Sequence, residues 1–234
     1  MHGGPIMSHG SIHDACGRGD VDAVRAFIAT DPASVDADDE HGWRPIFHTG
    51  LWRHESIVRL LIEAGADLAA HDGYVLHYAG EVLNNKRIVS LLIQYGGLEA
   101  HVRPTDDLSR QFLAAVFLAD MARARSMLGR HPHLATILDG RGDQPIQHAA
   151  RNGDTEIVRL MIEYGADINA TNKRGHTVLY CAGGHGHLET VQLLLENGVD
   201  NDAVTGLIEW VVEYPDDERF IPVMEALQKY TTGP

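Results

Sequence analysis

"IVRLLIEAGADLAA" (57–70), "IVRLMIEYGADINA" (157–170) and "TVQLLLENGVDNDA" (190–203) are three nearly identical stretches, and their recurrence decides the fold. The first two lie at an offset of 100 residues. Units that recur every ~20 to 50 residues are typical of solenoids, in which each unit buries its apolar face only against its neighbours. The chain is therefore predicted to be a stack of similar units.

The unit "QPIQHAARNGDTEIVRLMIEYGAD" (144–167) predicts two short helices joined by a tight turn. Pro145 can open the first helix, because the first N–H group of a helix has no intrahelical partner. Gly153 can end that helix in a left-handed conformation, and Asp154 can then cap the second helix. The apolar residues of the second helix fall on one face at helical spacing.

These units resemble the ankyrin repeat, whose signature is Gly-x-Thr-Pro-Leu-His-x-Ala-Ala, then Gly-His, then a Val-rich helix and Gly-Ala-Asp. The resemblance covers most of the chain and implies an all-α solenoid of helix-turn-helix units, of which the fourth is the most degenerate. The last segment does not follow the repeat wording, but its two apolar stretches predict a pair of capping helices. The expected boundaries are 1–10 for a flexible start or cloning remnant, 11–37, 38–70, 71–102, 103–136, 137–170 and 171–203 for six repeats, and 204–234 for the cap.

The second half of the chain copies the first at the offset of 100. Asp39 and His48 of the first half, for example, match Asp139 and His148 of the second. A block of three units written twice predicts that the two halves superpose. Whether this duplication carries functional meaning stays open at this point.

Composition and charge narrow the classes of function. The chain carries 19 Lys and Arg against 33 Asp and Glu, which gives a net charge of -14. This balance opposes a nucleic-acid role, because phosphate binding needs a net basic face. The two cysteines lie in different units and argue against a disulfide framework, and no apolar run reaches the length of a membrane span. We expect a monomeric cytoplasmic protein without nucleic-acid or membrane partners.

No motif for catalysis or metal binding stands out, so we expect no cofactor, no metal and no catalytic residues. "HGH" (185–187) is the tightest histidine pair, but the resemblance implies that His187 caps a second helix. The resemblance also implies that His13 and His77 bond turn backbone. In a regular stack, His48 and His148 lie three repeats apart, too far to share one metal ion unless the solenoid bends sharply.

The resemblance implies a concave groove lined by first helices and loop tips, and we take its side chains as the candidate binding site. Aromatic and Arg side chains often anchor recognition surfaces, although such residues can also simply pack on their neighbours. The candidate residues are Trp43, His48, Trp52, Tyr74, Tyr78, Glu81, Arg141, His148, Asn152, His176, Cys181 and His185. In the cap, Trp210 is either a buried aromatic or a docking point for a peptide.

We therefore expect a scaffold that binds a protein or peptide partner through its concave groove and loop tips, without catalysis. One alternative is a small-molecule-binding protein or enzyme in a pinched groove, with Glu81 or His148 as acid or base and Arg141 as an anion clamp. Another is a host-interacting effector module, which differs only in its partner.

Overall fold

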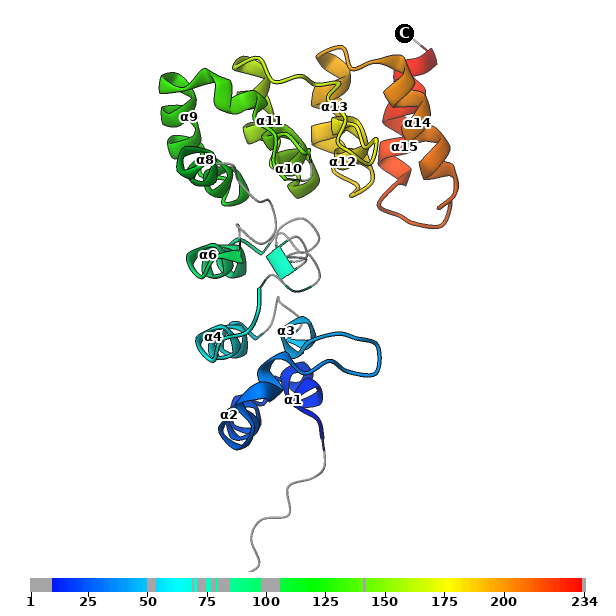
Figure 1. The fold of residues 1–234 in the computed structure, drawn as a ribbon. Coiled ribbons are helices and arrows are strands. Elements are labelled where there is room, and N and C mark those ends of the chain that lie inside the picture. Colours follow the sequence, from blue (N-terminus) through cyan, green and yellow to red (C-terminus); the bar gives the residue numbers. More distant parts are fainter. Residues whose placement is uncertain are drawn as a thin grey trace, which may run out of the picture.

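The chain folds as a stack of helical pairs (Figure 1) in a computed structural model that describes residues 10–49, 54–68, 70, 75–76, 79, 85–97, 106–140 and 142–232. The helices are α1 (Ile12–Arg18), α2 (Val21–Thr30), α3 (Pro45–His48), α4 (Glu55–Glu63), α6 (Lys86–Gln94), α8 (Asp107–Phe117), α9 (Met121–Arg130), α10 (Pro145–Asn152), α11 (Thr155–Glu163), α12 (Val178–Gly183), α13 (Leu188–Glu196), α14 (Asn201–Val212) and α15 (Ile221–Thr232), with 3₁₀-helices η1 (Pro32–Asp36) and η3 (Pro132–Thr136). In this part of the chain the extended pairing is confined to one isolated bridge, between Thr171 and Thr177. The predicted all-α solenoid is confirmed.

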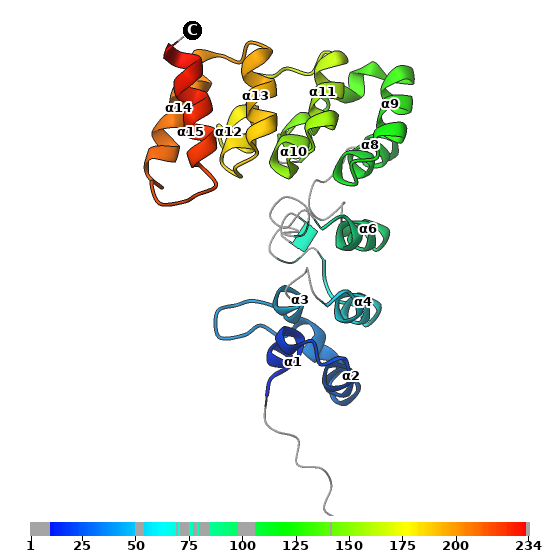
Figure 2. The ribbon, with the colours of Figure 1, turned by 180° about the vertical axis from the view of Figure 1, so that it is seen from behind.

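The stack changes direction at α8 and α9. Both views show α1 to α6 stacked along one line and α8 to α15 along another, with the first helices of the pairs on the inner side of the bend (Figures 1 and 2). None of the described helices is long and apolar enough to cross a membrane.

Helix α8 lies at the bend and contributes to the hydrophobic clusters of both halves. Phe112 and Val116 belong to the hydrophobic core of the second half, whereas Leu113 and Phe117 belong to that of the first half. All four are at most 1% exposed. The fourth unit, which looks degenerate in the sequence, therefore joins the two halves.

One cation ties three repeats together across the bend. Lys86 Nζ lies 2.6 Å from Asp154 Oδ2 and 3.2 Å from the carbonyl oxygen of Phe117. Asp154 occupies the N-cap position of α11 as predicted, but its side chain makes no capping hydrogen bond. The predicted cap is wrong in this respect, because the carboxylate pairs with Lys86 instead. Gly153 ends α10 in the left-handed conformation, with φ of 70°, as the sequence predicts.

The duplication is visible in matching side-chain contacts. His48 Nε2 lies 2.8 Å from Asp39 Oδ2, and His148 Nε2 lies 2.9 Å from Asp139 Oδ2. In both loops the aspartate N–H donates to a carbonyl four residues later, at Trp43 and Asp143 respectively, over 3.0 Å. The environments differ, since the first His–Asp pair is partly exposed and the second is fully buried.

Candidate functional site

A buried polar network lies between the fifth and sixth repeats. The ligand atoms of Asp139, Asp143 and His148 all lie within 4.8 Å of one another, and all three residues are buried. Asp143 Oδ1 accepts hydrogen bonds from Arg151 over 2.5 Å and from Asn172 over 2.8 Å. Burial raises the pKa of Asp143, but His148, Arg151 and the hydrogen bonds outweigh it, so the net pKa lies below its usual value. Asp143 therefore stays ionised in the fold.

Two carboxylates and an imidazole at this distance could in principle hold a cation. Here each group already has a partner: His148 bonds Asp139, and the guanidinium of Arg151 bonds Asp143. A metal ion would have to sit beside that guanidinium, where like charges repel across a buried site. We therefore interpret the cluster as a structural ion-pair network.

The network fixes the loop that carries His176. Asn172 Oδ1 accepts hydrogen bonds from the backbone N–H groups of Arg174 and His176, over 2.9 and 3.0 Å. Gln147 Nε2 donates to the carbonyl oxygen of His176 over 2.9 Å. Because Asn172 also bonds Asp143, the loop tip is tied to buried groups of the preceding repeat.

Beside this loop tip lies a groove of about 410 Å³ between repeat six and α14. The ring of His176 stacks on that of Tyr180 with centroids 4.4 Å apart, and Tyr180 meets Trp210 edge to face at 5.4 Å. Burial, followed by Arg151 and Arg174, lowers the pKa of His176, which keeps the imidazole neutral near pH 7. We call this the aromatic groove; its lining is Gly175, His176, Thr177, Tyr180, Asp202, Ala203, Gly206, Leu207 and Trp210.

Gly206 is the unexpected member of the aromatic groove. It lies in the interior of α14, where glycine costs about 1 kcal/mol relative to alanine. Neither a left-handed backbone nor a close neighbour requires it, because a Cβ at this position would meet nothing within 4 Å. The fold does not require this glycine, and a large side chain at this position would fill the groove.

The predicted site residues are distributed along the inner side rather than gathered at one point. Trp43 is 39% exposed at its loop tip and contacts Phe47 at 5.2 Å. His48 is partly exposed and bonded to Asp39, and His176 lines the aromatic groove. His185 is partly buried, with Nδ1 3.0 Å from the carbonyl oxygen of Cys181. The predicted residues Trp52, Tyr74, Tyr78, Glu81 and Arg141 lie outside the described residues.

Three of the predicted groove residues are not accessible. His148, Asn152 and Cys181 are at most 1% exposed, which differs from the expectation that they face the groove. Phe117 of α8 covers His148, with its ring centroid 4.9 Å from that of the imidazole, whereas the equivalent residue of the first half is Gly17. These side chains can support a binding surface but cannot touch a partner in this conformation.

Two of the histidine roles implied by the repeat signature can be compared with the structure. His13 Nε2 lies 2.8 Å from the carbonyl oxygen of Ala37, which confirms its contact with turn backbone. His187 stands at the N-cap of α13 but makes no capping bond; its Nε2 lies 2.8 Å from the carbonyl oxygen of Arg151 instead. The predicted cap is therefore wrong, and His187 joins two repeats. His77 lies among the residues that are not described.

Two aromatic residues of the second half are absent from the candidate list yet line the aromatic groove. Tyr180 stands where the repeat signature has its histidine, and for Trp210 the sequence leaves open a buried cap aromatic or a docking point for a peptide. Trp210 is also packed, with ring centroids 5.2 Å from Phe220 and 4.8 Å from Tyr214. It therefore contributes to the cap and to the groove at once.

Comparisons with known proteins agree with the repeat pattern. The family model for ankyrin repeats (3 copies) matches residues 112–205. Rabankyrin-5 of Mus musculus is 28% identical over 131 residues, which is 55% of this chain and 11% of that protein. The NF-kappa-B inhibitor cactus of Drosophila yakuba is 28% identical over 174 residues, covering 73% of this chain and 34% of that protein. The chain thus spans about a tenth to a third of the length of these relatives.

Two solved structures are also similar. One is a chain of the complex of the predatory endopeptidase Bd0816 from Bdellovibrio bacteriovorus with the immunity protein Bd3460, with a TM-score of 0.48 and 23% identity. It covers 81% of this chain and 99% of that chain. The other is the ankyrin repeat domain of Bcl-3, with a TM-score of 0.44 and 24% identity, covering 83% of this chain and 89% of that chain.

Proposed function

Because the chain belongs to the ankyrin repeat family, we propose that it is a binding protein that holds a protein or peptide partner against its first helices and loop tips, without catalysis. The aromatic groove is the described part of that surface with the best anchors. Gly206 carries the proposal, since a helix that tolerates an unneeded glycine beside an aromatic groove leaves room for a ligand.

The chemistry of the aromatic groove suits a peptide. Tyr180 and Trp210 offer large apolar faces with polar tips, which is the usual make-up of residues that dominate binding energy. Lys173 and Arg174 are exposed on the loop side and Asp202 on the α14 side, so polar groups of both signs flank the rings. A segment of a partner can place one side chain against the rings and pair its polar groups at the rim.

Rigidity adds to affinity in this proposal. The backbone of His176 is bonded to Asn172 and Gln147, and both of these side chains are buried. A surface that is already ordered loses little conformational entropy on binding. A relative aligned over 174 residues is named as an inhibitor of NF-kappa-B, that is, as a protein that acts on another protein, which supports a partner of this class.

The alternative, an enzyme in a pinched groove, is not supported by the position of His148, its candidate acid or base within the described residues. The side chain of His148 is fully buried against Asp139 and does not line the aromatic groove, so it cannot exchange a proton with a substrate bound there. Glu81 and Arg141 lie outside the described residues. We therefore retain the binding function.

The test uses Gly206 to close the aromatic groove without touching its walls. Partners are captured on the wild-type chain, identified by mass spectrometry, and then measured in purified form against two variants. Gly206→Phe fills the groove, whereas Gly206→Ala adds one methyl group to open space and serves as the matched control. We expect Gly206→Phe to weaken the partner at least ~10-fold and Gly206→Ala to leave it unchanged. Equal binding by all three chains would remove the aromatic groove from the proposal.

A further inference from the structure

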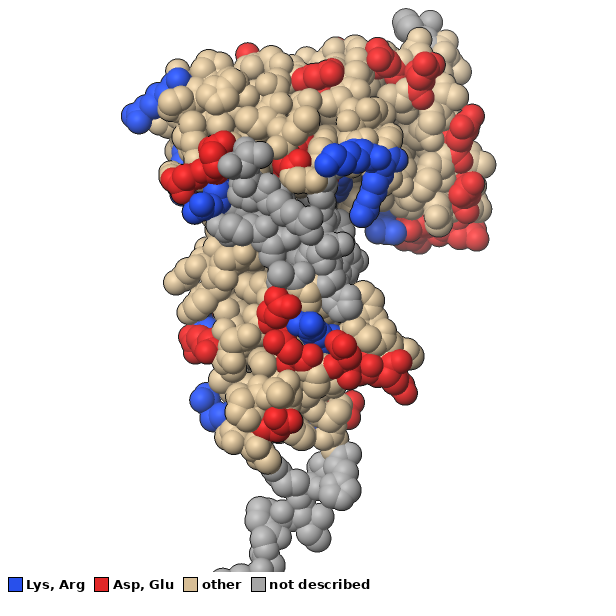
Figure 3. Space-filling view, in the orientation of Figure 1, with Lys and Arg blue, Asp and Glu red and all other residues tan. Residues whose placement is uncertain are grey.

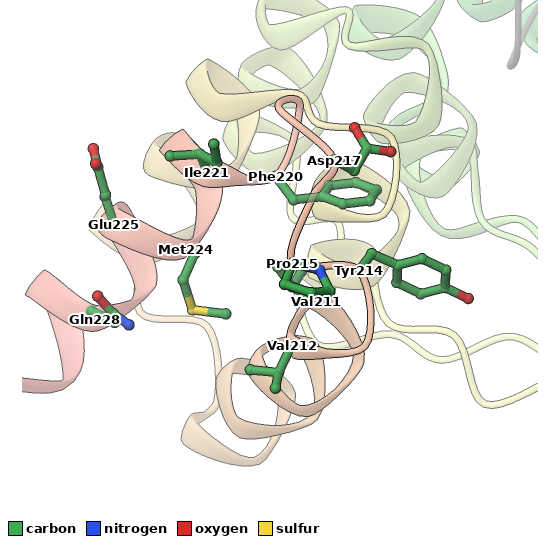
Figure 4. A pocket seen from close by; sticks show the side chains of 10 residues that line it. All are labelled: Val211, Val212, Tyr214, Pro215, Asp217, Phe220, Ile221, Met224, Glu225 and Gln228. Carbon is green, nitrogen blue, oxygen red and sulfur yellow. The ribbon is translucent and has the colours of Figure 1, made fainter.

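A second apolar surface lies at the end of the cap, between α14 and α15. It is a groove of about 330 Å³, which we call the cap-end groove, and its apolar lining includes the exposed residues Val212, Tyr214 and Ile221 and the partly buried Met224. In Figure 4, Met224 of α15 and Val212 of α14 face one another across it. Val212, Tyr214 and Ile221 are 60%, 45% and 50% exposed, which is costly for residues of this size clustered on one face.

The cap-end groove rests on packed side chains. In the loop between α14 and α15, Nε and a terminal nitrogen of Arg219 lie 2.9 and 2.6 Å from the two carboxylate oxygens of Asp217. The guanidinium of Arg219 also lies over the ring of Phe220, at 5.1 Å from its centroid. Phe220 is only 3% exposed and packs against Trp210. The exposed apolar side chains are therefore presented by a packed support.

The surroundings of the cap-end groove are strongly acidic. Residues 209–225 contain six Asp and Glu and a single basic residue, Arg219, which forms an ion pair with Asp217. Four of the other carboxylates are exposed and form no ion pair with any described residue: Glu213, Asp216, Glu218 and Glu225. Figure 3 shows acidic side chains along the edge of the molecule that α14 and α15 form.

An apolar floor with an acidic rim selects its occupant by charge. We propose that the cap-end groove docks an amphipathic segment of a partner protein, whose apolar side chains are flanked by lysine or arginine. Such a segment buries Val212 and Ile221 and places its cations beside the free carboxylates, which favours association and fixes its orientation. A second copy of this chain would bring two acidic rims together, and like charges at an interface are unfavourable.

The experiment uses the full chain and a defined probe. The probe is a fluorescein-labelled synthetic helix of about 14 Leu and Lys residues with its leucines on one face, and its control carries Glu at every Lys position. Fluorescence anisotropy measures both against wild type, the double variant Val212→Ser with Ile221→Ser, and Leu138→Ser. Leu138 lies on another repeat and is 56% exposed, close to the 60% of Val212. Leu138→Ser therefore shows what the loss of an exposed aliphatic side chain does outside the cap-end groove.

We expect the Lys probe to bind, the double variant to weaken it at least ~10-fold, and Leu138→Ser to leave it unchanged. The pair Glu213→Gln with Glu225→Gln should also weaken the Lys probe and reduce the dependence of its Kd on salt. The ε-methyl resonance of Met224 should shift on addition of the Lys probe to the wild-type chain, which locates binding without any mutation.

Four results would overturn the proposal. The first is equal binding of the Lys probe by wild type and the double variant. The second is an unmoved Met224 resonance, and the third is a Glu probe that binds as tightly as the Lys probe. The fourth is a wild-type dimer in sedimentation that the double variant converts to a monomer, because the occupant would then be a second copy.

Discussion

Replacing Asp143 by alanine should destabilise the chain far more than removing a similar aspartate at its surface. The side chains of Asp143 and Arg151 are 5% and 10% exposed, and their atoms lie 2.5 Å apart. Asp143→Ala takes the carboxylate away from a buried guanidinium and from the amide of Asn172. Removing one partner of a buried ion pair costs about 3–5 kcal/mol, because the other charge stays in a poorly solvated site.

The matched control is Asp217→Ala. Like Asp143, Asp217 pairs with an arginine, Arg219, which it binds through both carboxylate oxygens. This pair is more exposed, because the side chains of Arg219 and Asp217 are 65% and 28% exposed. Water replaces the lost bonds there, so the expected loss is about 0–1 kcal/mol. Both variants remove a carboxylate from an arginine, but Asp143→Ala does so in a buried site and also takes a hydrogen-bond acceptor from Asn172.

Urea denaturation followed by far-UV circular dichroism gives the free energies of unfolding. A third variant, Asp143→Leu with Arg151→Met, removes both charges, and we expect it to lose less free energy than Asp143→Ala alone. If Asp143→Ala loses no more than Asp217→Ala, or if the double variant is the least stable of the three, the buried network does not stabilise the fold as described.

Other consequences can be measured in the same way. Gly206→Ala should raise the free energy of unfolding by about 0.5–1 kcal/mol, because it removes a glycine from a helix interior at a site with free space; a loss of stability would show that the site is not open. Gly153→Ala should cost at least ~1 kcal/mol more than Gly165→Ala, since both have positive φ but only at Gly153 would a Cβ meet His187, at 2.5 Å; equal losses in thermal melts would contradict this contact. Burial lowers the pKa of His187 more than its bond to the Arg151 carbonyl raises it. Its contribution to stability is thus present above the ordinary histidine pKa near 6.5 and is lost as the pH falls through the lower pKa of the folded state, so His187→Gln should flatten the decline in stability below about pH 6.5.

The second helices could be predicted because the apolar residues that stabilise them recur at helical spacing within each repeat. The stretches 57–62 and 157–162 place their apolar residues on one face, and Ile57, Val58, Ile157 and Val158 are all at most 1% exposed. The contact of each His with its Asp, at 48 and 148, follows from the duplication in the same way. Local sequence was enough to predict the position of a residue wherever that residue packs only against its own repeat and the next.

The inner surface could not be predicted so well, because it depends on how repeats are placed relative to one another. His48 and His148 occupy equivalent positions, yet only His148 is covered, since Phe117 lies against it and the equivalent residue beside His48 is Gly17. Helix α8 contributes to the hydrophobic clusters of both halves, although its unit looks like a poor repeat when it is read alone. Likewise, Tyr180 and Trp210 meet only because α14 lies against α12, which no repeat wording specifies.

The central claim is that the aromatic groove receives a partner, and the ratio of two dissociation constants tests it most directly. Isothermal titration of a purified partner, or of its binding segment, against Gly206→Phe and Gly206→Ala compares a filled groove with an open one on the same helix position. We predict a Kd at least ~10-fold higher for Gly206→Phe. Equal dissociation constants, with both variants folded, would contradict the account.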